Sequence, residues 1–130
     1  MVFLTLEPRV LARTVELACH APSVHNSQPW RWVDQGPDLM LFRQSKRVPD
    51  ATDLTGREAM ISCGAALNHL LVASAAEGLQ ANVSRFPNPN DPDHLAIISF
   101  SPMRFVTDAH RARADAILRR EPPRLSSLVR

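Results

Sequence analysis

Apolar and polar positions repeat along the chain with two periods, one typical of helices and the other of strands. Apolar residues recur at three- and four-residue spacing in three long segments, residues 7–20, 56–77 and 107–120. Four shorter segments are continuous or alternating apolar runs typical of strands, residues 30–33, 39–42, 80–86 and 95–100. The predicted order of elements is therefore α-β-β-α-β-β-α.

Pairs of strands between single helices predict an α+β fold, with a mixed or antiparallel sheet packed with helices. The turn-forming residues 34–38 favour a hairpin between the first two strands. No G-x-G-x-x-G sequence follows a predicted strand, which disfavours a dinucleotide-binding fold. A chain of 130 residues is long enough for one domain with one core. We expect this unit at residues 1–120 and a flexible tail at residues 121–130.

Residues at the predicted helix ends support these assignments. Thr5 can cap the first helix, and Pro8 fits its first turn. Thr55 and Glu58 form a capping box for the longest helix, and Gly78 ends that helix.

The longest helix is rich in small and apolar residues, so we expect it to pack on several faces at once. Asn68 and His69 within it are interpreted as interior polar groups rather than ligands. Trp30 and Trp32 share one strand face and are expected in the core rather than stacked on a ligand ring. Six residues are predicted along one side of the helix: Met60, Ile61, Gly64, Leu67, Leu71 and Ser74.

Residues 21–30 connect the first helix to the first strand and contain the candidate chemistry. Pro22 and Pro29 fix their own φ angles and bias the residues before them away from helix. Carboxamides both donate and accept, so they suit a planar ring edge that alternates acceptor, N–H and acceptor, as an isoalloxazine edge does. A second interpretation stays open, in which these side chains only satisfy local backbone groups. The polar side chains of the segment are a hydroxyl, an imidazole and two carboxamides: Ser23, His25, Asn26 and Gln28.

Composition and charge limit which classes of partner and which cellular compartment we expect. A net charge of +2 gives no indication of a nucleic-acid or anionic-membrane partner. Cys19 and Cys63 lack metal-ligand spacing and are expected to be free core thiols in a reducing compartment, without a metal. Charged residues interrupt the first 20 positions, which disfavours a signal peptide. No run reaches the ~18 uninterrupted apolar residues of a spanning helix, so a cytoplasmic protein without membrane contact is expected.

Four segments, in order, resemble the flavin-dependent nitroreductases and, more narrowly, the Acg-like NAD(P)H nitroreductases of mycobacterial type. The first contains the pattern P-S-x-x-N-S-Q-P-W at residues 22–30. One such motif is weak evidence, but four in order across nearly the whole chain are specific. The four segments are residues 17–30, 56–59 (Gly-Arg-Glu-Ala), 86–92 (Phe-Pro-Asn-Pro-Asn-Asp-Pro) and 113–118 (Arg-Ala-Asp-Ala-Ile-Leu).

The resemblance implies a nitroreductase-like α+β fold and an FMN cofactor reduced by NAD(P)H. It implies that Pro22, Ser23, Asn26 and Gln28 lie against the flavin ring, with His25 as a weaker candidate. The Arg-rich stretch that holds the FMN phosphate on an early helix of single-domain nitroreductases has no match here. Arg119 and Arg120 are the nearest equivalent, and they are interpreted equally well as part of a solvated basic tail.

The chain resembles only the N-terminal half of a two-lobed family member, a single incomplete lobe. We therefore expect a homodimer or a missing second lobe to complete the site. Three functions stay open at this point. The first is two-electron reduction of a small-molecule acceptor, a nitroaromatic or a quinone, with no catalytic side chain needed. The second is flavin binding or sequestration without turnover, and the third is a truncated, non-functional remnant.

Overall fold

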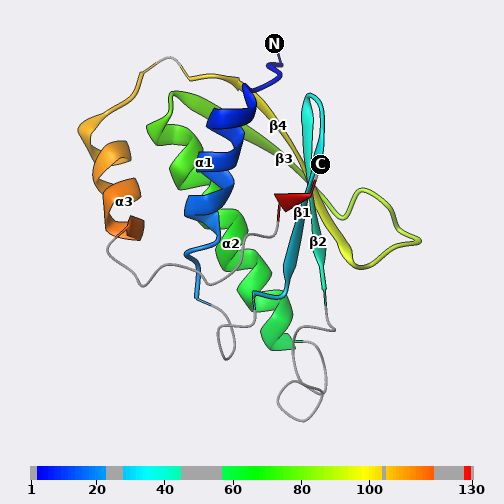
Figure 1. The fold of residues 1–130 in the computed structure, drawn as a ribbon. Coiled ribbons are helices and arrows are strands. Elements are labelled where there is room, and N and C mark those ends of the chain that lie inside the picture. Colours follow the sequence, from blue (N-terminus) through cyan, green and yellow to red (C-terminus); the bar gives the residue numbers. More distant parts are fainter. Residues whose placement is uncertain (1–2, 23–27, 45–56, 104, 119–127, 130) are drawn as a thin grey trace.

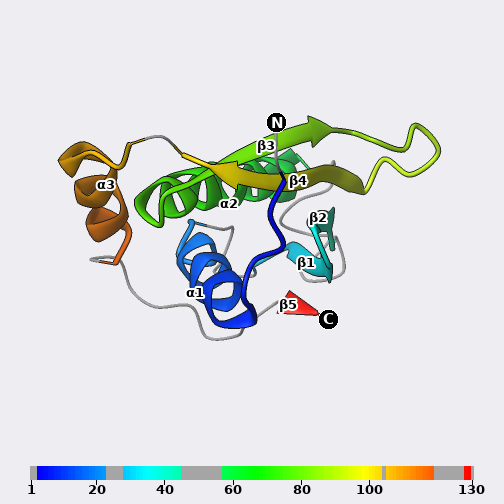
Figure 2. The same cartoon turned by 90° about the horizontal axis from the view of Figure 1, so that it is seen from above.

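The computed structural model describes residues 3–22, 28–44, 57–103, 105–118 and 128–129 (Figure 1). Seven of its elements follow the predicted order α-β-β-α-β-β-α, and a short fifth strand comes last as the eighth element. The three helices lie on one side of a single sheet, as both views of the ribbon show (Figures 1 and 2). The predicted α+β class with a mixed sheet is therefore confirmed.

The sheet has five strands in the order β3-β4-β2-β1-β5. β1 (Trp30–Gln35) and β2 (Asp38–Arg43) form the predicted antiparallel hairpin. Its turn uses Gly36 at a φ of 75°, where the Gly36 N–H donates to Asp34 Oδ1 at 3.1 Å. β3 (Leu79–Arg85) and β4 (His94–Pro102) form a second antiparallel pair, and β4 also pairs with β2.

β1 and β2 alternate by a period of two, so one face of each points toward the helices. Trp30 and Trp32 are fully buried on that face, as are Leu39 and Leu41 of β2, and Trp32 pairs directly with Leu41. Their expected place in the core is confirmed. The apolar run of β4 is buried at Leu95, Ala96 and Ile98 and half-buried at Ile97.

α1 (Pro8–Ala18) begins with proline in its first turn, as predicted. The predicted cap by Thr5 is wrong. The helix begins at Pro8, so the N-cap residue is Glu7, and its side chain forms no capping hydrogen bond. Arg13 is half-exposed and donates two hydrogen bonds of 2.8 Å to Glu77, which joins α1 to the end of α2.

α2 (Arg57–Ala76) is the central helix and packs against α1, α3 and the sheet. It ends as predicted, with Gly78 at a φ of 79° donating its N–H to Ala75 O at 3.1 Å. The capping residue predicted before it lies outside the described residues. Its length and mean hydropathy of 1.5 would allow a membrane span, but 44% of that window is buried inside the protein. A core helix passes the same test, and the packing of α2 fits that role.

The apolar side of α2 that the sequence indicates is only partly buried. Ile61 is 61% exposed and Gly64 is exposed, so the sheet and α1 cover a neighbouring stripe of the helix instead. Asn68 is also exposed rather than interior, and His69 is half-buried. A helix that is apolar on every side has no polar face to fix its rotation, so the pattern alone leaves the buried side undetermined. The buried stripe is Ala59, Ser62, Cys63, Ala66, Leu67, Leu70, Ala73 and Ser74.

α3 (Asp108–Leu118) begins at a reciprocal cap. The His110 N–H donates to Thr107 Oγ1, and the Thr107 N–H donates to His110 Nδ1, each at 3.2 Å. β5 (Leu128–Val129) runs parallel to β1 at the sheet edge. The remaining tail residues lie outside the described residues, so the division into a lobe and a flexible tail stays a prediction.

Candidate functional site

Two of the seven predicted site residues belong to the described part of the chain. Pro22 and Gln28 stand at the two ends of the connector between α1 and β1. The five others lie outside the described residues: Ser23, His25, Asn26, Arg119 and Arg120. The structure therefore defines how the connector is held at both ends.

The entry to the connector is a tight turn that continues α1. The His20 N–H donates to Leu17 O, and the Ala21 N–H donates to Ala18 O, each at 3.1 Å. Ala18 and Ala21 are buried in the core, while Pro22 is exposed. The chain thus leaves the core at Pro22, the position where the sequence predicts the helix to stop.

The exit from the connector is strained and buried. Gln28 has a φ of 48°, a left-handed conformation that is uncommon for a residue other than glycine. Its side chain is 3% exposed and takes part in an interaction within the chain. Such strain persists only where the surroundings fix the backbone, which marks Gln28 as a rigidly held end of the connector.

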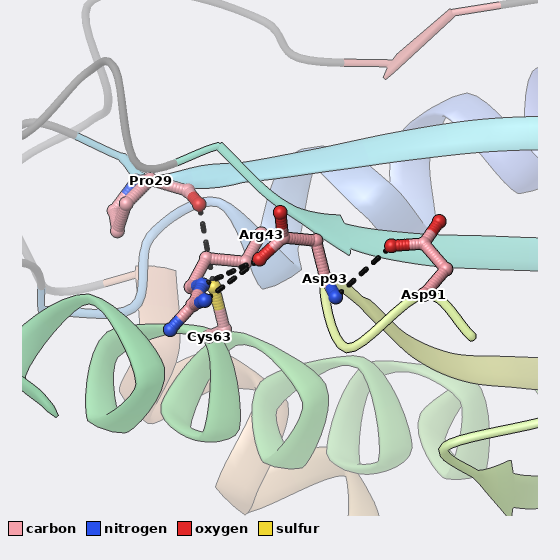
Figure 3. A network of polar contacts seen from close by, with 5 residues as sticks. All are labelled: Pro29, Arg43, Cys63, Asp91 and Asp93. Atoms are coloured by element: carbon pink, nitrogen blue, oxygen red, sulfur yellow. Dashed lines mark hydrogen bonds and ion pairs between the residues drawn. The ribbon is translucent and has the colours of Figure 1, made fainter. Parts of the chain in front are cut away.

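The Pro29 carbonyl oxygen accepts two hydrogen bonds at this exit. It accepts one from the Gln44 N–H at 2.7 Å. It accepts a second one from the Cys63 thiol at 3.3 Å (Figure 3). Pro29 is fully buried, and so is Trp30, which begins β1. The central helix and the end of β2 therefore both hold the residue that closes the connector.

An ion pair next to this contact joins β2 to the β3–β4 loop. Arg43 Nε and Nη2 donate to Asp93 Oδ1 at 2.9 and 2.7 Å, and the Arg43 N–H donates to Asp93 O at 2.8 Å (Figure 3). The Asp93 N–H in turn donates to Asp91 Oδ1 at 3.1 Å. Because Arg43 is mostly covered, the pair fixes the end of β2 from which Gln44 reaches Pro29.

Burial raises the pKa of the Cys63 thiol to about 12, with Arg43 lowering it slightly and Asp93 raising it. A thiol with this pKa stays protonated at neutral pH, so it can donate to the Pro29 carbonyl and is a poor nucleophile. Cys63 is thus a structural donor, and Cys19 is likewise buried and free. Both agree with the expected free core thiols.

We expect the stability of the fold to fall above pH 9, because of Cys63. In the unfolded chain this thiol ionises near its ordinary pKa of 9.0, whereas in the folded chain it keeps its proton to about pH 12. Above pH 9 the unfolded state holds fewer protons, so the free energy of unfolding falls by about 1 kcal/mol between pH 9 and 10. Below pH 9 both states hold the proton and the effect vanishes.

Urea unfolding of the wild type and of Cys63→Ala at pH 7, 9 and 10 measures this dependence. The variant should lack the part of the alkaline slope that Cys63 contributes. An identical slope in both proteins would rule out the assigned role of this thiol.

The polar groups described at the ends of the connector suit neutral hydrogen bonding rather than metal binding. No group of three or more metal-ligating side chains gathers among the residues that the structure describes. The residues that brace the connector, Arg43, Cys63 and Asp93, were not predicted from the sequence. They are far apart along the chain and follow no motif. The pairing of β2 with β4 brings Arg43 and Asp93 together, and the packing of α2 against the sheet brings Cys63 to Pro29.

Comparison with known proteins matches these observations. The chain is 60% identical over 116 residues, 89% of its length, to the Mycobacterium tuberculosis protein named "Putative NAD(P)H nitroreductase acg". It is 49% identical over 114 residues to a second protein of that organism, "Putative NAD(P)H nitroreductase Rv3131". The chain resembles the Acg-like nitroreductases. It spans about a third of the length of these relatives, 35% and 33%. No family model matches the chain.

Two solved structures share the fold of this Acg-like chain. One is described as a putative NADH dehydrogenase/NAD(P)H nitroreductase from Parabacteroides distasonis, with a TM-score of 0.61 at 15% identity, covering 94% of this chain and 82% of the other. The other is a nitroreductase family protein from Clostridium novyi, with a TM-score of 0.54 at 16% identity, covering 82% and 77%. The nitroreductase-like fold is therefore confirmed.

Proposed function

We propose that this chain provides one lobe of the flavin site of an NAD(P)H-dependent oxidoreductase of nitroreductase type. The observation that carries the proposal is the 60% identity to the Acg protein across a span that includes residues braced at both ends of the connector. The fold supports it, because nitroreductase-like structures match nearly the whole chain. The electron acceptor would be a small nitroaromatic or quinone.

The residue types in the connector fit the ring of FMN, but the connector contains no cationic partner for its phosphate. Ser23 and Asn26 offer neutral donors and acceptors to the ring edge. Gln28 is already engaged inside the protein, so in this proposal its part is to hold the segment. A dianionic phosphate needs guanidinium or backbone N–H partners, and Arg119 and Arg120 are our candidates for that contact.

Bound FMN would supply the redox chemistry, hydride uptake from NAD(P)H and electron transfer to the acceptor. The residues of this chain would bind and orient the ring. Pro22 is exposed where the segment begins, and Pro29 is braced where it ends. Fixing the two ends reduces the conformational entropy that the segment between them can lose when a ligand binds.

A complete site requires a second lobe, which we propose to be another copy of this chain or another protein part. α2 leaves Ile61 and Gly64 exposed on a face that no described element covers. Sedimentation would test this: a folded monomer that binds FMN tightly would contradict the need for pairing.

We further propose a soluble, cytoplasmic protein, in line with the free buried thiols.

Purification of the chain, followed by visible absorbance, tests the proposal. We expect flavin absorbance bands that survive gel filtration and are bleached when NADH or NADPH is added without oxygen. Bands without bleaching would indicate flavin sequestration without turnover. A soluble, folded dimer of the chain that binds no added FMN would contradict the proposal.

Asn26→Ala is expected to weaken FMN binding about fivefold. The substitution removes one neutral hydrogen bond to the ring edge, which contributes about 1 kcal/mol. Asn90→Ala is the matched control, because Asn90 is exposed in the β3–β4 loop. Fluorescence titration of FMN into each protein measures the change, and equal affinities in all three would remove Asn26 from the site.

A further inference from the structure

A hollow lies between α2 and α3, away from the connector. Its volume is about 350 Å³, near the lower end of the range of small-ligand pockets. Figures 1 and 2 both place α3 on the side of α2 away from the β1–β2 hairpin, so this cleft is separate from Pro29 and Trp30. Six residues line it: Asn68, His69, Val72, Arg113, Ala116 and Ile117.

The cleft contains a cation that pairs with nothing in the described part of the chain. Arg113 has no ion-pair or hydrogen-bond partner there, whereas Arg111, two residues earlier on α3, lies 3.7 Å from Asp108. Asn68 on the facing helix also makes no hydrogen bond within the described residues. The cleft thus presents a planar guanidinium and a carboxamide, both able to donate to one oxyanion.

The rest of the cleft is apolar. Ile117 is buried at its floor, and Val72 and Ala116 contribute aliphatic walls. A bare inorganic ion would leave this surface uncovered. An organic anion would instead bury an apolar body against it while its head group meets Arg113.

We propose that the α2–α3 cleft binds a small organic anion with one oxyanion head, carboxylate or phosphate, and an apolar body. The head group accepts from the Arg113 guanidinium and the Asn68 carboxamide. The body lies against Val72, Ala116 and Ile117. The site does not use the connector of the proposed flavin site, and it requires no redox chemistry.

Titration of the ¹⁵N-labelled chain by NMR tests the proposal, with benzoate and phenyl phosphate as the two probes. We expect saturable shifts at residues of α2 and α3 lining the cleft, with a Kd on the order of 1 mM for a ligand of this size. Benzyl alcohol, which lacks the charge, and acetate, which lacks the ring, should each bind at least tenfold more weakly. The stronger of the two probes identifies the preferred head group.

Three variants separate a built site from general charge attraction. Arg113→Gln should weaken binding tenfold or more, and Ala116→Leu should abolish it by filling the cleft. Arg111→Gln, the matched control on the same helix, should change Kd less than twofold. Thermal melts by circular dichroism confirm that each variant is folded. No saturable shifts with either probe, or equal losses in Arg113→Gln and Arg111→Gln, would overturn the proposal.

Discussion

Trp30→Ala is expected to lower the free energy of unfolding by about 3–5 kcal/mol, the largest loss of any single truncation considered. Trp30 is fully buried and belongs to the hydrophobic core that α1, α2 and the sheet share. Truncation removes most of that apolar contact and leaves a cavity directly after the braced Pro29. A domain of this size has a total stability of only about 5–15 kcal/mol, so the variant approaches unfolding at room temperature.

Trp30→Phe is the matched comparison. The Trp30 indole N–H has no hydrogen-bond partner within the described residues, so its removal sacrifices no such bond. The loss should therefore be clearly smaller than for alanine, and it reflects only the smaller ring. Urea unfolding followed by far-ultraviolet circular dichroism measures both variants. Equal losses for alanine and phenylalanine would show that the indole ring is not packed as described.

Leu70→Ala is expected to lower the free energy of unfolding by about 2–5 kcal/mol. Leu70 is fully buried at the middle of α2, where the central helix faces the core. The helix itself is not weakened, because alanine has the higher helix propensity. The entire loss therefore reports core packing around α2.

Ile61→Ala is the control for Leu70→Ala on the same helix. Ile61 is 61% exposed, so its truncation in the isolated chain should change stability by no more than about 0.5 kcal/mol. A large loss at this position would mean that another molecule covers α2 in solution, which would favour a dimer through this face. A small loss at Leu70 would contradict the position assigned to α2.

Much of the fold follows from local pattern. The four main strands and three helices were predicted with ends within a few residues, because Gly36, Gly78 and the prolines act on the backbone next to them. The rotation of α2 could not be predicted in the same way. Its residues are apolar on all sides, so only the neighbours it meets decide that Leu70 is buried and Ile61 is exposed.

The candidate site was predictable in part for the same reason. The connector of residues 21–30 is a local feature, and its prolines and carboxamides are visible in the sequence. Its bracing is not local: Cys63 comes from the central helix and Asp93 from the β3–β4 loop, and neither has a motif. Resemblance supplies the flavin hypothesis itself, since carboxamides in a loop are equally compatible with local backbone contacts.

Chemical-shift mapping of FMN binding tests the central claim most directly, the claim that the braced connector contacts a flavin. We predict that added FMN shifts the backbone amides of residues 23–28 most strongly, with Cys63 and Gln44 next through their contacts with Pro29. Saturable FMN binding that leaves residues 23–28 unshifted, or no binding to the folded protein, would contradict the account.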